Sequence, residues 1–153
     1  MALTDAEVLN VIQESCDVPR PEHFTDRGHC CECADHDDML RSRDLDSLTI
    51  SDVGNPGWDP VCFVTDQAFF YYFPALARLA LDQPQQGQGW YFEQLLFHLT
   101  YEDGTNRRML AAAARYKEAV LLLLRHVRDS RGALVEEYSC KQGLEQALAI
   151  WNY

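Results

Sequence analysis

Residues 66–81 read DQAFFYYFPALARLAL, and this stretch decides the fold because its apolar residues recur at helical spacing. The broad apolar face predicts the centre of the core, and it comprises Phe69, Phe70, Tyr72, Phe73, Leu76, Leu79 and Ala80. Thr65 is a good N-cap for this helix. Pro74 lacks the N–H that a helix interior needs, so we expect it either to kink the segment or to begin a second helix.

Helix signals extend outward on both sides of this segment. Thr4 and Glu7 form a capping box, which predicts a helix over residues 5–16. Further helices are expected over 30–43, 90–101, 106–129 and 139–151, and Gly132 is expected to end the one over 106–129. The sequence therefore predicts one all-α domain over residues 1–153 with five to seven helices, and it leaves open one short strand or hairpin near residues 45–64.

Charge is distributed unevenly along the chain. Residues 1–66 hold 15 acidic and 4 basic residues, which accounts for the whole net charge of −11. Residues 105–131 are basic by contrast, with seven Arg and Lys against Glu118 and Asp129. Direct nucleic-acid binding is disfavoured because phosphate contacts need a positive surface. An acidic surface suits a basic partner protein or simple solubility.

The N-terminal residues and the apolar runs argue for a soluble protein. MALTDAEVLN has neither the basic nor the apolar region of a secretory signal, and the longest aliphatic run is AVLLLL at 119–124. That run is far short of the roughly 20 residues that span a membrane. We therefore expect a cytoplasmic protein whose six cysteines are free thiols.

The stretch HCCECADHDD, residues 29–38, is the main candidate for a metal site. Cys30, Cys33 and His36 offer ligand types that zinc prefers, with His29 or His23 as a fourth. A structural zinc site normally draws two ligand pairs from separate segments, and no second pair follows. His98, His126 and Cys140 stand isolated in the sequence. A zinc site is therefore the alternative interpretation, and no cofactor is the primary one.

Thiol chemistry is disfavoured at the same stretch. A redox C-x-x-C motif normally opens a helix beside a βαβ unit, and the four neighbouring acids are expected to raise the thiol pKa values. No nucleophile signature surrounds any cysteine. The favoured interpretation is a helix start in which Cys30, Cys33 and Leu40 pack inward while the acids face water.

Several acids and one tryptophan are candidates for contact with a partner. The acids are Asp35, Asp37, Asp38, Asp44, Asp46 and Asp52. Trp58 lies in the loop GNPGWDP at 54–60, where it either packs against the core or is presented to a partner.

Four segments resemble a family of small bacterial and phage proteins to which no activity is attached. They are PEHFTDRGHCCECADHDDML (21–40), GNPGWDPVCF (54–63), YYFPALARLAL (71–81) and LEQALAIW (144–151). The resemblance covers residues 20–82 and, weakly, the C-terminal helices. It implies a bacterial or phage origin and a helical fold, and it identifies no catalytic residue.

These observations favour a non-enzymatic interaction protein. By analogy of size and acidity alone, the chain is similar to immunity proteins against toxins and to phage inhibitors of the anti-CRISPR class. We expect the protein to bind and inhibit a basic partner, such as a toxin or a nucleic-acid-binding complex, and to form a homodimer. The alternative is a zinc-binding protein or metal-dependent enzyme that uses the cysteine-rich stretch.

Overall fold

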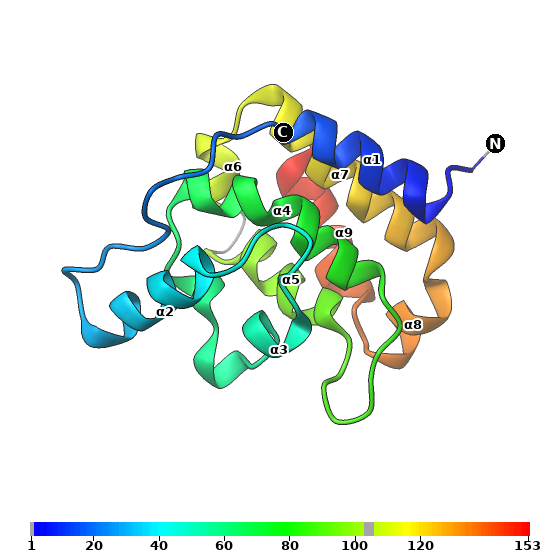
Figure 1. Ribbon diagram of the computed structural model, residues 1–153. Coiled ribbons are helices and arrows are strands. Elements are labelled where there is room, and N and C mark those ends of the chain that lie inside the picture. Colours follow the sequence, from blue (N-terminus) through cyan, green and yellow to red (C-terminus); the bar gives the residue numbers. More distant parts are fainter. Residues whose placement is uncertain (1, 103–105) are drawn as a thin grey trace.

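Helices form almost all of the regular structure in the computed structural model, which describes residues 2–102 and 106–153 (Figure 1). The α-helices are α1 (Asp5–Ser15), α2 (Cys31–Arg41), α3 (Ile50–Val53), α4 (Asp66–Leu81), α5 (Tyr91–Thr100), α6 (Arg107–Ala111), α7 (Ala114–Ser130), α8 (Gly132–Glu137) and α9 (Lys141–Trp151). Two 3₁₀ turns, η1 (Pro56–Trp58) and η2 (Pro60–Cys62), precede α4. The all-α prediction is confirmed. No helix within the described ranges is long and apolar enough to cross a membrane.

Helix α4 runs through the middle of the molecule and is packed on nearly every side (Figure 1). Helices α1, α5 and α7 contact it, and α9 packs against α5 and α7. Twelve of its sixteen residues are buried, so almost no face is left for water. A helix that is apolar all round must be enclosed, which explains why the other helices surround it.

Polar contacts join α1 and α7 to the end of α4. Asp5 in α1 accepts a hydrogen bond from the Arg131 guanidinium at 2.7 Å and lies 2.7 Å from His126 Nε2. Arg131 also donates to the Leu81 carbonyl oxygen at 2.8 Å. The hydrogen bond from Arg131, together with His126, holds the pKa of Asp5 below its ordinary value even though burial acts to raise it. Three helices therefore meet at one ion-paired carboxylate.

Two predicted helix starts are confirmed. The Thr4 hydroxyl accepts from the Glu7 N–H at 3.2 Å, and the Glu7 carboxylate accepts from the Thr4 N–H at 2.8 Å, which completes the capping box of α1. Thr65 caps α4 by accepting from the Ala68 N–H at 3.1 Å. Pro74 lies inside a continuous α4, so of the two alternatives, a kink or the start of a second helix, the second is wrong.

The predicted helix over 106–129 is divided in two. Helix α6 ends at Ala111 and α7 begins at Ala114, although the intervening alanines are the best helix formers. Within α6, the buried guanidinium of Arg108 donates to the Val61 carbonyl oxygen at 3.0 Å and holds this short helix against η2. Gly132 is the first residue of α8, whereas it was expected to end the helix over 106–129. With these divisions and the short α3, the described residues form nine α-helices, above the predicted five to seven.

Residues 45–64 contain no strand in the described structure. They form α3, η1 and η2, and the nearest pairing is an isolated bridge between Thr25 and Val64. Side chains close the turns here, because Asn55 Oδ1 accepts from the Gly57 N–H and Asp59 Oδ1 accepts from the Val61 N–H, both at 2.9 Å. Pro and acidic side chains thus favour tight turns over an extended ladder.

Asp37 holds the loop before α2 against the helix. Its buried carboxylate accepts from the Phe24 N–H at 2.6 Å and from Arg27 Nη1 at 2.9 Å, and it lies 2.9 Å from His23 Nδ1. Burial acts to raise the pKa of Asp37, but these hydrogen bonds outweigh it and leave the pKa below the ordinary 3.8. The loop that carries His29 and Cys30 is therefore fixed by a charge that belongs to α2.

Two valines of α1 test the packing of the core. Val8 is fully buried and Val11 is 40% exposed on the same helix. We expect Val8→Ala to lower the free energy of unfolding by about 2 kcal/mol, through lost apolar burial and the cavity left behind. Val11→Ala, the matched control, should change it by no more than about 0.5 kcal/mol. Urea denaturation measures both, and equal losses would contradict the placement of α1.

The Asp37 network predicts a specific dependence of stability on pH. Because the folded pKa is lowered, its contribution is fully present above pH 3.8 and is lost as the pH falls below that value. We expect Asp37→Asn to cost about 1–3 kcal/mol at pH 7, since buried partners lose their acceptor. The difference from wild type should shrink below pH 4, whereas the exposed Asp35→Asn should show no such trend in denaturant titrations.

Candidate functional site

The start of α2 brings three potential metal ligands together, and we call His29, Cys30 and Cys33 the α2 cluster. Cys30 is the N-cap of the helix and its sulfur accepts from the Cys33 N–H at 3.4 Å. The two sulfurs lie 3.3 Å apart, and Cys33 Sγ lies 3.5 Å from His29 Nδ1. All three ligand atoms lie within 4.8 Å of one another. Ligand atoms around a tetrahedral zinc ion stand about 3.3–3.8 Å apart, so the observed distances fit one.

The two thiols of the α2 cluster have opposite environments. Cys30 is exposed, and hydrogen bonds from the Cys33 N–H, from His29 and from the Cys33 thiol lower its pKa to about 7. Cys33 is buried, and desolvation followed by the neighbouring Cys30 raises its pKa to about 11. The expectation that acids raise both thiol pKa values is therefore wrong for Cys30. Its place at a helix N-terminus, where N–H groups stabilise a thiolate, outweighs the acids.

His36 does not join the α2 cluster. Its ring is buried, with Nε2 3.0 Å from Glu32 Oε2. The ring also packs against Trp58, at a centroid distance of 4.6 Å, and against Phe63 at 5.2 Å. Of the predicted ligands, Cys30 and Cys33 therefore lie together without His36, and His29, which was considered as a fourth ligand, lies beside them. His29 and Cys33 are four positions apart, and this spacing places both on one side of the helix start.

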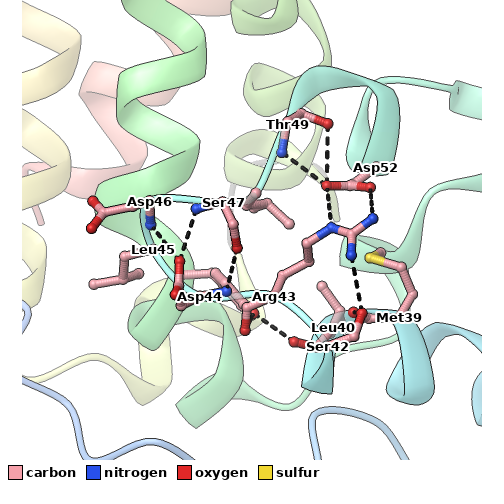
Figure 2. Close-up of polar contacts among 12 residues, drawn as sticks. Met39, Leu40, Ser42, Arg43, Asp44, Leu45, Asp46, Ser47, Thr49 and Asp52 are labelled. Carbon is pink, nitrogen blue, oxygen red and sulfur yellow. Dashed lines mark hydrogen bonds and ion pairs between the residues drawn. The ribbon is translucent and has the colours of Figure 1, made fainter.

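Two of the six candidate partner-binding acids stabilise the segment after α2 (Figure 2). Arg43 forms a bidentate ion pair with Asp52, in which Nε donates to Oδ2 at 3.0 Å and Nη2 donates to Oδ1 at 3.1 Å. Asp52 Oδ2 also accepts from the Thr49 N–H. Asp44 Oδ1 accepts from the Ser47 N–H at 2.8 Å and from the Asp46 N–H at 3.0 Å. These carboxylates satisfy backbone and side-chain donors within the chain.

The remaining candidates differ in exposure. Asp37 is buried in the network described above, and Asp38 is exposed and paired with Arg27. Asp35 and Asp46 are exposed, and no side-chain contact of either is found among the described residues. Trp58 is 46% exposed, and its ring contacts that of His36 at an interplanar angle of 51°. A partner surface would therefore rest on Asp35, Asp38, Asp46 and Trp58.

A second cluster, which the sequence did not reveal, consists of Asp59, Cys62 and His98, and we call it the η2 cluster. The ligand atoms of these residues also lie within 4.8 Å of one another. The interpretation of His98 as isolated is wrong, because its Nε2 lies 2.7 Å from Asp59 Oδ2. The spacing Asp59-x-x-Cys62 indicates two potential ligands one turn apart. His98 joins them only through the packing of α5 beside η2.

Comparison of the chain with protein-family models, with curated proteins and with solved structures finds no match.

Proposed function

We propose that the protein binds a zinc ion through His29, Cys30 and Cys33. The observation that supports this most directly is the convergence of one imidazole nitrogen and two sulfurs within 4.8 Å. Imidazole and thiolate are the ligands that zinc prefers in proteins, and other divalent cations such as magnesium and calcium prefer oxygen. A C-x-x-C pair alone would serve redox chemistry equally well, whereas the adjacent imidazole favours a cation.

The exposure of the cluster determines what the ion could do. His29 and Cys30 are exposed, so an ion bound there would keep one coordination position toward solvent or a partner. The loop before α2 is already held by Asp37 through His23, Phe24 and Arg27. The ligands are therefore prearranged without the ion, which supports a regulatory or partner-binding zinc site over one that drives folding.

The acidic-contact hypothesis has weaker support from the same geometry. Asp37, Asp44 and Asp52, three of its six carboxylates, accept hydrogen bonds from donors inside the chain. Charge alone would attract zinc and a basic protein alike, because both are cations. The specific arrangement of sulfur and nitrogen donors is what separates the zinc proposal from general acidity.

Metal content of cysteine variants tests the proposal. We expect protein purified with zinc under reducing conditions to lose one equivalent of zinc in Cys33→Ser, and zinc affinity to fall at least about tenfold in His29→Gln. Cys31→Ser is the matched control, because Cys31 is exposed beside the cluster but lies outside it. Elemental analysis and competition with a chelating dye supply the readouts.

Two outcomes would overturn this function. Zinc content unchanged in both Cys30→Ser and Cys33→Ser would place any bound ion elsewhere. Absence of zinc under reducing conditions, with ready formation of a Cys30–Cys33 disulfide on mild oxidation, would assign the cluster to thiol–disulfide exchange instead.

A further inference from the structure

The η2 turn presents a carboxylate and a thiol side by side. Asp59 is the N-cap of η2 and Cys62 is its last residue, so the two stand one turn of 3₁₀ helix apart. Asp59 is buried, while Cys62 is exposed. The Val61 N–H donates to Asp59 Oδ1 at 2.9 Å, which leaves Oδ2 directed to other groups.

Helix α5 supplies the third ligand and the support for the first. His98 Nε2 lies 2.7 Å from Asp59 Oδ2. Gln94, one turn earlier, donates to the same oxygen at 2.7 Å and to the Val53 carbonyl oxygen at 2.8 Å. A carboxylate that is oriented by a neighbouring amide is typical of the outer shell around a metal ligand.

The geometry of the η2 cluster differs from that of a catalytic relay. In a relay the imidazole uses one nitrogen for the acid and the other for the nucleophile, which keeps the two on opposite sides of the ring. Here Cys62 Sγ lies within 4.8 Å of both the Asp59 oxygen and the His98 nitrogen. Three ligand atoms this close together suit a shared cation, which would replace the hydrogen bond between Asp59 Oδ2 and His98 Nε2 and move these atoms from 2.7 Å to about 3.3 Å apart.

Tyr91 provides an independent observation at the same place. Its side chain is 98% buried, and its hydroxyl has no hydrogen-bond partner among the described residues. Burial raises the pKa of this hydroxyl, and the charges of Asp59 and Cys62 raise it further. A buried hydroxyl without a partner is costly, and Tyr91 lines the same cavity as Asp59 and Cys62.

Two cavities meet at this cluster. One has a volume of about 370 Å³ and is lined by Cys62, His98 and Arg108 among others. The other has a volume of about 380 Å³ and is lined by Asp59, Cys62 and Tyr91 among others. Cys62 lines both, so an ion bound there could be reached by a small molecule.

We propose that Asp59, Cys62 and His98 form a second zinc site, separate from the α2 cluster, whose fourth position opens to the adjoining cavities. Three protein ligands with one open position are the pattern of catalytic rather than structural zinc. Water bound at that position would be a far stronger acid than free water. Zinc binding itself displaces the thiol proton of Cys62.

Arg108 determines which further ligands the site would accept. Burial of its guanidinium is the main cause that lowers the pKa of Arg108 to about 10. The charges of Asp59 and Cys62 act in the opposite direction and raise it. A fixed cation beside the zinc weakens binding of another cation in the cavity and favours a small anion. The exogenous ligand class that fits is therefore water, hydroxide or a small anion.

Cobalt titration of a protein without the α2 cluster tests this inference. In Cys30→Ser/Cys33→Ser we expect one equivalent of Co²⁺ to bind, with a sulfur-to-cobalt absorption band from a single thiolate. Adding Cys62→Ser should remove that band, and adding His98→Gln should weaken Co²⁺ binding at least about tenfold while keeping a hydrogen bond to Asp59. Azide should shift the visible bands, because the fourth position is open.

Controls separate this inference from the first zinc site. Adding Cys31→Ser to the double variant should leave the cobalt spectrum unchanged, and circular dichroism should show that every variant keeps its helices. No cobalt binding by a folded double variant, or a spectrum that Cys62→Ser does not change, would overturn the second site. Loss of one zinc equivalent on Cys33→Ser alone tests the α2 cluster, so the two proposals fail independently.

Discussion

Burial of α4 on nearly all sides is the constraint on which the other elements depend. Its few polar groups face the segments that cover it and bind their backbone. Tyr72 donates to the Leu40 carbonyl oxygen at 2.6 Å, and Arg78 donates to the Leu45 and Leu48 carbonyl oxygens at 2.9 Å. Helix termini leave carbonyls without partners, so these contacts fix the end of α2 and the turn after it. The core thus positions α2, and α2 positions its cluster.

Buried charges play the same part for the two clusters. Asp37 accepts hydrogen bonds from the loop that carries His29 and Cys30. Arg108 donates hydrogen bonds to the Val61 and Val64 carbonyl oxygens beside Cys62. Each charge is costly to bury and is retained because several partners satisfy it. Removing either side chain would loosen the turn that carries residues of the corresponding cluster. The clusters are therefore built by polar contacts, on a core that is built by apolar ones.

Local chemistry made part of this structure predictable. The capping box at Thr4, the cap at Thr65 and the apolar face of residues 66–81 depend on neighbours within one turn, and all three are observed. The break before Ala114 was not predictable, because alanines favour a continuous helix and the contact of Arg108 with η2 joins segments far apart in the sequence. His98 was missed for the same reason, since no periodicity within α5 reveals that Asp59 lies opposite. Fold class follows from local pattern, while the clusters need long-range packing.

The surroundings of the two clusters imply different preferences. Desolvation and Cys30 are the main causes that raise the pKa of Cys33, and the nearby carboxylates Asp26 and Glu32 add to them, so the α2 cluster lies in a field that attracts cations. Burial is the main cause that raises the pKa of Cys62 in the η2 cluster; the carboxylates Asp59 and Glu32 add to it, and Arg108 opposes them. The charges around the α2 cluster would therefore favour a cation more strongly than those around the η2 cluster, where a guanidinium opposes the acids.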